Sequence, residues 1–134
     1  MIDQLQTRLP AISIHARDLD RLRQLADAAA ETYPATAEFL AREIDRATVL
    51  PPDHPANDVV TMQARVTFRD DVTRQTRSVT LVYPDEADVD AGRISILTPI
   101  GAALIGLSPG QAIAFQTPTG GWRSLTVIGV APPS

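Results

Sequence analysis

The spacing of apolar residues along the chain changes once, close to the Pro-rich stretch 51–55. In residues 19–47 the apolar positions recur every three or four residues, which predicts amphipathic helices. In residues 59–130 apolar and polar residues mostly alternate, which predicts strands with one buried face. The pattern therefore predicts an α+β chain in which a pair of helices precedes a sheet.

The first helix is expected to begin at Asp18, whose side chain is a suitable N-cap, and to run to about Glu31. The apolar stripe includes Leu22 and Leu25. Tyr33-Pro34 should end the helix, because proline lacks a backbone donor and disfavours helical angles in the residue before it. Residues 12–14, just before this helix, are expected to be a short extended segment.

The second helix is expected to begin at Thr36 and to bury Leu40 and Ile44 against the first helix in an antiparallel hairpin. The polar residues assigned to its other faces are Arg42, Glu43 and Arg46. Each helix should contain about 14 residues, so that the hairpin would be about 20 Å long.

Strands and one short helix are expected after the Pro-rich stretch. Residues 59–69 and 77–83 should pair as an antiparallel hairpin around a turn at Asp70-Asp71, and an acidic loop, 84–92, should follow. The remaining elements are a strand at 94–97, a helix at 99–105 that Gly106 closes, and strands at 112–117 and 122–130 joined by a tight turn.

Composition narrows the function classes. The chain has 134 residues and a net charge of -4, its 12 basic residues are all arginine, and it has no cysteine. The missing cysteine and lysine exclude thiolate and Schiff-base catalysis and the lysine-dependent phosphate loop. A weakly acidic chain favours a protein partner over nucleic acid. With no apolar run of membrane-spanning length and no secretory signal pattern, we expect a cytoplasmic protein.

Groups that support catalysis or metal binding are sparse. His15 and His54 lie far apart, and the acidic stretch 85–90 lacks the glycine and the closing glutamate of a calcium loop. Most of the aromatic residues fall on strands and are assigned to the core, so that the sequence predicts no aromatic-lined pocket. We therefore expect no catalytic residue, no cofactor and no metal, and a protein that is not an enzyme.

Ordered blocks of sequence cover most of residues 57–130, at 57–69, 80–84, 94–107 and 109–111. These blocks resemble the regulator of nucleoside diphosphate kinase (Rnk) family, which shares its C-terminal pattern with the GreA and GreB transcript-cleavage factors. The helical part matches more loosely, through residues 41–47. The resemblance implies a short N-terminal coiled-coil hairpin (1–50), a Pro-rich linker (51–57) and an FKBP-like C-terminal domain (58–134) with an antiparallel sheet and one short helix.

The resemblance also implies a partner. Gre factors dock their C-terminal domain on RNA polymerase, on the β′ subunit beside the secondary channel, and insert a long coiled coil whose tip acids help to hold the catalytic magnesium. The docking turn is matched here by Ser95, Leu97, Thr98 and Pro99. Leu97 stands where the cleavage factors carry an acid, and strand alternation with Ile94 and Ile96 inward would turn Leu97 toward solvent.

The tip of the shorter hairpin is matched by Asp27, Glu31 and Tyr33, whose two acids are not adjacent. We therefore expect a transcription regulator that binds the channel rim and competes with Gre factors without stimulating cleavage. The family name adds an effect on nucleoside diphosphate kinase. Two other classes stay open: an adaptor for another protein, and a prolyl isomerase, which would need an aromatic-lined pocket.

Overall fold

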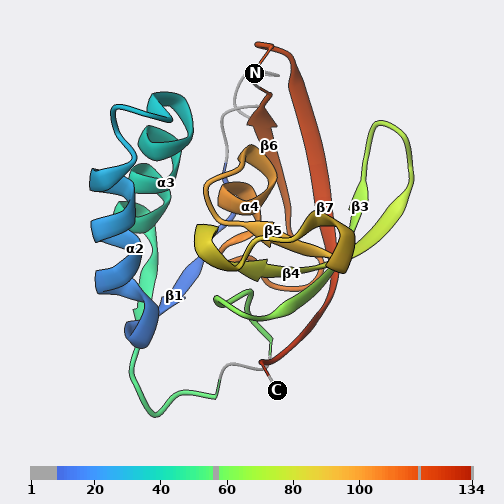
Figure 1. The fold of residues 1–134 in the computed structure, drawn as a ribbon. Helices are drawn as coiled ribbons and strands as arrows, with labels where there is room; N and C mark the ends of the chain where they lie inside the picture. The colour runs from blue at the N-terminus through green and yellow to red at the C-terminus, as the bar shows by residue number, and fades with distance from the viewer. Residues whose placement is uncertain (1–8, 56–57, 118, 134) are drawn as a thin grey trace, which may run out of the picture.

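A helical hairpin stands beside a curled sheet in the computed structural model, which describes residues 9–55, 58–117 and 119–133 (Figure 1). Strand β1 (Ser13–His15) leads into α2 (Ala16–Ala28), and α3 (Pro34–Arg46) runs back to β2 (Thr48–Leu50). Strand β1 precedes α2 and β2 follows α3, and the two strands pair in parallel at the base of the hairpin. The extended segment expected before the first helix is confirmed as β1.

Helix α2 begins and ends earlier than the capping pattern predicted. His15, not Asp18, is the N-cap, and its Nδ1 accepts the backbone N–H of Arg17 at 3.3 Å. Asp18 lies in the first turn and is buried, because its carboxylate has a distant partner described below. The helix ends at Ala28, before the expected Glu31, since the chain already turns over residues 29–33.

Helix α3 begins at Pro34, so that the proline expected to end the first helix begins the second. A proline costs no hydrogen bond in the first turn, where the N–H has no intrahelical partner. Thr36 is therefore not the cap. Glu43, expected on an outer face, is buried, because Arg46 donates to both of its carboxylate oxygens at 2.7 Å. The same arginine also donates to the carbonyl of Pro10.

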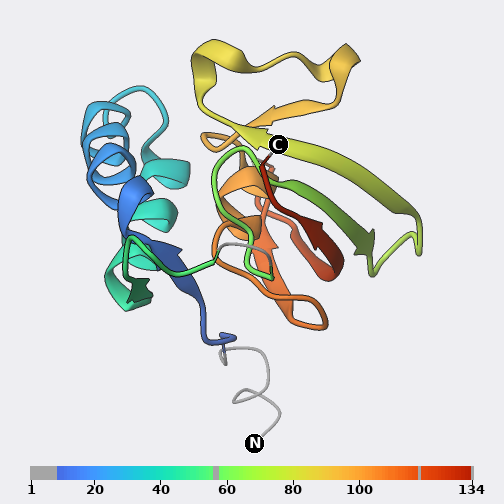
Figure 2. The ribbon, with the colours of Figure 1, turned by 90° about the horizontal axis from the view of Figure 1, so that it is seen from below.

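The C-terminal half forms a five-stranded sheet in the order β5-β4-β3-β7-β6, which curls around the short helix α4 (Figures 1 and 2). The elements are β3 (Arg65–Asp70), β4 (Thr76–Val82), β5 (Arg93–Ser95), α4 (Pro99–Leu104), β6 (Ala112–Gln116) and β7 (Trp122–Ala131). All neighbours are antiparallel except β4 and β5, which are parallel. The expected α+β class is confirmed, but the sheet is mixed because the segment 83–92 returns the chain to the same edge through two 3-10 turns, η1 (Pro84–Glu86) and η2 (Val89–Ala91).

The first strand of this half is shorter than its alternation predicted. Residues 59–64 are largely buried but irregular, since Gln63 adopts a left-handed φ of 72°. Val60 instead bonds the chain after α4: its N–H donates to Leu107 O at 2.8 Å, and its carbonyl accepts from Gly106 N at 2.9 Å. Regular pairing starts at Arg65, opposite Thr80.

One cluster of buried side chains joins the hairpin to the sheet. Leu22, Leu40 and Ile44 of the hairpin belong to it together with residues of all parts of the sheet and of α4. The apolar stripe expected on α3 is therefore confirmed at Leu40 and Ile44, and it packs on α4 as well as on α2. The side of the hairpin, rather than its base alone, lies against the sheet half of the molecule (Figure 1).

Candidate functional site

A groove of about 410 Å³ lies over the face of the sheet that carries Phe68 and Phe115. Strands β3, β6 and β7 form its floor, the start of α4 forms one wall, and the loop 84–92 contributes Ala87 and Val89. Among the described residues, every residue that lines it falls between 68 and 125, so that the helical hairpin takes no part in it.

The groove has an aromatic component that the sequence analysis did not predict. Phe68 on β3 and Phe115 on β6 are both assigned correctly to the core, being 2% and 5% exposed, but they also line the groove. They come from strands that are far apart in sequence and are separated in the sheet by β7. The expectation of no aromatic-lined pocket is therefore wrong. The alternation of apolar and polar residues identifies buried side chains, but it does not show which of them border a groove at the edge of the core.

The predicted docking turn forms part of the groove wall. Ser95, Thr98 and Pro99 line the groove, whereas Leu97 does not and is half-buried against the core. The side chain of Thr98 caps α4, because its Oγ1 accepts from Gly101 N at 3.0 Å and donates to Ser95 O at 2.7 Å. These bonds fix the turn relative to the sheet.

Gly101 allows this turn to lie close to α4. A Cβ at this position would lie 2.2 Å from the carbonyl oxygen of Ser95, well inside the contact distance of the two atoms. The glycine is thus required by the close approach of two backbone segments rather than by an unusual φ. The position of the groove wall depends on a residue that itself lies outside the groove.

Arginine dominates the charge of the lining. Arg77 lies over the ring of Phe68, with 5.9 Å between the guanidinium carbon and the ring centroid. Arg123 pairs with Asp70 on the neighbouring strand, and Arg93 pairs with Asp88 at 3.5 Å. The backbone N–H of Thr73 and the nearby Arg123 lower the pKa of Asp70, which is therefore a carboxylate at neutral pH. Among the residues that the structure describes, three guanidinium groups and one carboxylate line the groove.

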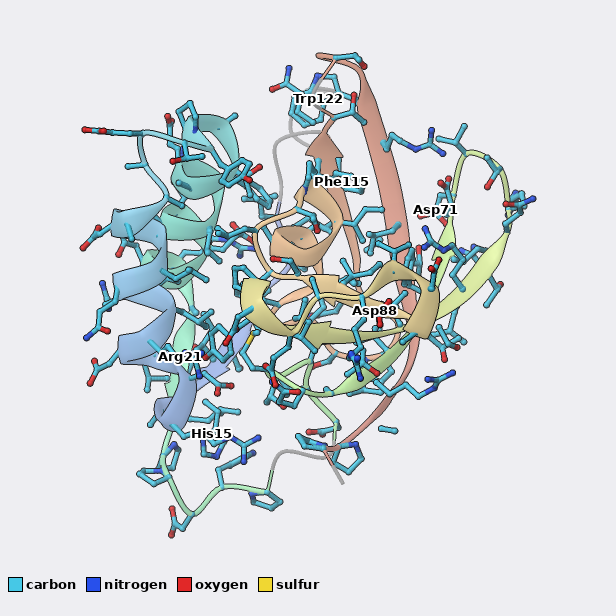
Figure 3. The ribbon with its side chains drawn as sticks, viewed as in Figure 1. His15, Arg21, Asp71, Asp88, Phe115 and Trp122 are labelled. Carbon is cyan, nitrogen blue, oxygen red and sulfur yellow. The ribbon has the colours of Figure 1, made fainter. Side chains whose placement is uncertain are left out.

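A second polar cluster lies around Asp71, at the turn between β3 and β4, and joins this turn to β7. Asp71 accepts from Thr126 Oγ1 at 2.8 Å, Arg69 Nε at 2.9 Å and Ser124 Oγ at 3.2 Å. Partial burial acts to raise the pKa of Asp71, but the three hydrogen bonds together lower it. Figure 3 shows this residue at the hairpin end of the sheet, while Asp88 lies on the loop in front of the sheet. No group of three or more potential ligands for a metal ion occurs within the described residues.

The predicted tip residues lie at the turn between α2 and α3. Asp27 is in the last turn of α2, Glu31 is in the connection, and Tyr33 precedes α3; all three are exposed. Each helix has 13 residues, and at 1.5 Å per residue the hairpin is about 20 Å long. The structure thus places these side chains together at one end of the hairpin and apart from the groove.

Polar contacts join the helical half of the chain to the segments that follow it. Asp18 Oδ2 accepts from Met62 N at 3.2 Å, and the guanidinium of Arg21 stacks 3.6 Å from the ring centroid of Tyr83. The buried ring of His15 bonds the carbonyl of His54 through Nε2 at 3.1 Å (Figure 3). Sequence analysis missed this role of His15 and Asp18, because each partner lies about 40 residues away.

Burial is the main influence on the pKa values of Asp18 and Tyr83 in this contact region. It raises the pKa of Asp18 against the opposing effects of the Met62 hydrogen bond and Arg17. It also raises the pKa of Tyr83 to about 12, with a smaller contribution from the charge of Asp18. A shallow cleft between Arg21 and Pro84 borders the same region. No helix among the described residues has the length and apolar character needed to cross a membrane.

Comparisons with known proteins point to two related groups. Residues 55–132 match the family described as "Transcription elongation factor, GreA/GreB, C-term", and residues 10–50 match "Rnk N-terminus". The regulator of nucleoside diphosphate kinase of Escherichia coli K12 is 36% identical over 119 residues, which cover 89% of this chain and 88% of that protein. Transcription elongation factor GreA of Azorhizobium caulinodans is 38% identical over 91 residues, covering 68% of this chain but 57% of that protein.

A solved structure agrees with these matches. The prokaryotic transcription elongation factor GreA/GreB from Nitrosomonas europaea superposes with a TM-score of 0.70 at 35% identity, and the match covers 92% of this chain and 99% of that one. The helical hairpin and the curled sheet are therefore similar in both molecules.

Proposed function

This chain belongs to the family of Rnk and Gre transcription factors, and we propose on that premise that it is a non-enzymatic regulator that binds RNA polymerase at the rim of the secondary channel. Its partner would be the β′ region beside the channel, where it would compete with Gre factors without stimulating transcript cleavage. The observation that supports the proposal is the groove, whose wall includes Ser95, Thr98 and Pro99, residues of the turn that we propose as the counterpart of the Gre docking segment.

The groove supports docking through its shape and its rigidity. It offers apolar surface from Ile100, Leu125 and the two phenylalanines, and its wall is held by the cap of α4. A preformed site of this kind loses little conformational entropy on binding. We propose Ser95, Thr98 and Pro99 as contact residues, and Leu97 as the residue that positions the turn through its packing on the core.

The hairpin supports occupancy without chemistry. Each helix of the hairpin has 13 residues, which corresponds to a length of about 20 Å. We propose that Asp27, Glu31 and Tyr33 stop short of the polymerase centre, so that the tip acids hold no catalytic magnesium there. The name of the Escherichia coli relative adds an effect on nucleoside diphosphate kinase, which we carry over as a change in the amount or activity of that enzyme.

The test combines capture and cleavage. Purified chain is immobilised and incubated with purified RNA polymerase, and the same preparation is added to backtracked elongation complexes with and without GreA. We expect capture of polymerase, no shortening of the RNA by the chain alone, and inhibition of GreA-stimulated cleavage. Shortened RNA with the chain alone would contradict the non-enzymatic role. Absence of capture would favour an adaptor for a different protein, and turnover of a proline-containing test peptide would favour an isomerase.

A further inference from the structure

The arginines of the β3–β4 hairpin differ from the other arginines in their ion pairing. Eight arginines have a carboxylate oxygen within 4.0 Å. Among the described residues, Arg65, Arg74 and Arg77 have none, and all three belong to the hairpin 65–82. Arg77 lies over the ring of Phe68, which leaves its charge without a counterion. The arginines without an acidic partner are therefore concentrated on one unit of the fold.

The acids of this hairpin do not neutralise its outer end, because both are bound at the base of the turn. Asp70 pairs with Arg123 and accepts from two backbone N–H groups of the turn. Asp71 pairs with Arg69 and accepts from two hydroxyl groups of β7. Residues 72–77 contain two arginines and no acid. The turn therefore carries positive charge that has no partner within the described part of the chain.

Arg74 adopts a backbone conformation that is unfavourable for its residue type. Its φ is 67°, in the left-handed region that glycine and asparagine occupy at lower cost. Gln63 also has a positive φ, but its side chain donates to Glu86 at 2.7 Å. The side chain of Arg74 is exposed and makes no hydrogen bond or ion pair with the described residues. A strained residue whose side chain has no internal contact indicates a role outside the fold.

The turn is open to a large ligand. Residues 72–78 are all exposed. The helical hairpin stands on one side of the molecule and the β3–β4 turn projects from the other side (Figures 1 and 2). A rigid, extended partner can therefore approach the turn without meeting α2 or α3.

The side chains of the turn favour phosphate groups over a protein surface. Thr73, Gln75 and Thr76 add neutral donors to the two arginines, and Val72 is the one apolar residue in 72–77. Protein interfaces have an apolar centre, whereas interfaces with DNA are polar and positively charged, with many hydrogen bonds to phosphate. The same six residues include no aromatic side chain on which an unpaired base could stack. This combination fits the backbone of a duplex better than a single strand.

We propose that the β3–β4 turn, residues 72–77, binds the phosphate backbone of a nucleic-acid duplex without reading its sequence, with one phosphate at Arg74 and one at Arg77. The contact goes beyond the function proposed above, since it requires only the chain and the duplex. Two phosphate contacts and a net charge of -4 make the complex weak. The sequence analysis favoured a protein partner from the total charge, which does not show where arginines lack acidic partners.

The first test follows the ¹⁵N-labelled full chain by NMR while a DNA duplex of about 16 base pairs is added at low salt. We expect chemical-shift changes at the amides of residues 72–77, and a slope of about -1.8 for the logarithm of the binding constant against the logarithm of the salt concentration, as two phosphates predict. No change at the turn would overturn the proposal. Polyglutamate at the same charge concentration should bind more weakly, and equal binding would overturn the choice of phosphate.

The second test uses variants at these positions and a matched control. Arg74→Gly and Arg77→Gln should each weaken duplex binding about threefold or more at low salt and make the salt slope shallower by about 0.9, whereas Arg74→Lys should bind normally. Arg42→Gln removes the same charge from an exposed arginine of α3 that pairs with Glu38, and should leave binding within about twofold of the unmodified chain. An equal loss in the control would show an effect of net charge alone and would overturn the proposal.

Thermal unfolding tests the origin of the strain at Arg74. Glycine relieves the left-handed conformation, so that Arg74→Gly should unfold about 2 °C higher than the unmodified chain although it binds the duplex less well. A lower midpoint would show that Arg74 stabilises the turn and would contradict its functional assignment.

Capture of polymerase separates this proposal from the proposed function. If the unmodified chain captures polymerase and Arg74→Gly binds the duplex normally, the duplex proposal is wrong and the proposed function stands. If the chain binds the duplex through the turn but does not capture polymerase, the duplex proposal stands and the proposed function is wrong.

Discussion

Replacing Gly101 by alanine tests whether the position of the groove wall depends on the close approach of α4 to the proposed docking turn, residues 95–99. The new Cβ would meet Ser95 O at 2.2 Å, Ile96 Cα at 3.0 Å and Ser95 C at 3.0 Å. All three are backbone atoms, so that rotation of a side chain cannot relieve the contact. Helix and turn must separate by about 1 Å before the contact with the carbonyl oxygen becomes acceptable.

Two effects of this substitution oppose each other. Alanine is favoured over glycine inside a helix by about 1 kcal/mol. Overpacking of a tightly packed site costs about 1–3 kcal/mol, and more where the backbone has to move. Because the clash at Gly101 involves only backbone atoms, we expect overpacking to dominate and the free energy of unfolding to fall by about 2 kcal/mol.

Urea unfolding followed by circular dichroism measures this change, with Gly129→Ala as the control. A Cβ at Gly129 would have no heavy atom within 4 Å, and its φ is not positive, so this substitution should be neutral or slightly stabilising. Polymerase capture by the folded Gly101→Ala variant should also weaken, since Ser95, Thr98 and Pro99 are displaced. A Gly101→Ala variant as stable as the unmodified chain would refute the packing argument.

Three further substitutions test the packing of the hairpin. Leu40→Ala should cost about 2–4 kcal/mol and lower amide-exchange protection in both the helices and the sheet, because Leu40 belongs to the shared cluster; loss confined to the helices would show that the hairpin unfolds alone. Glu43→Ala should cost about 3 kcal/mol in urea unfolding by leaving Arg46 without its buried partner, and an unchanged midpoint would contradict this. The raised pKa of Asp18 favours the protonated form in the folded state, so its stabilising contribution is present below about pH 3.8 and is lost as pH rises through the folded-state pKa. Asp18→Asn should therefore gain stability relative to the unmodified chain between about pH 3 and pH 7, and a constant difference across this range would contradict the assignment.

Periodicity predicted the elements well where local sequence decides them. The α3 stripe, the β3–β4 hairpin, the helix at Pro99 and its closure at Gly106 follow from apolar spacing and from the preferences of proline and glycine. In the helices and in the β3–β4 hairpin, the backbone hydrogen bonds that define the element join sequence neighbours or residues of the adjacent strand.

The errors fall where a residue binds a distant part of the chain. Asp18 has the chemistry of an N-cap, but its carboxylate accepts the N–H of Met62 and the cap passes to His15. The alternation of residues 59–64 continues that of β3, yet Val60 bonds Leu107 and Gly106 rather than a strand. Local patterns define the options open to a side chain, and the tertiary partner selects among them.

The same distinction explains why the groove was not predicted although its two aromatic residues were correctly placed on strands. Phe68 and Phe115 were assigned to buried faces, and both are buried. A groove forms where the core ends, and its position depends on the curl of the sheet around α4 and on the loop that presents Ala87 and Val89. Neither the curl nor the path of that loop has a local sequence signal.

The groove and the helical hairpin are formed by different parts of the chain. This arrangement allows the proposed binding to polymerase to be independent of any role of the hairpin in transcript cleavage. The groove is lined by residues of the C-terminal half, whereas the position of the hairpin is set by contacts outside it, at Asp18, Arg21 and the shared core. A change in the length or tip of the hairpin therefore leaves the proposed docking surface intact, since no lining residue is contributed by α2 or α3. The proposed docking surface is thus compatible with hairpins that support transcript cleavage and with hairpins that do not.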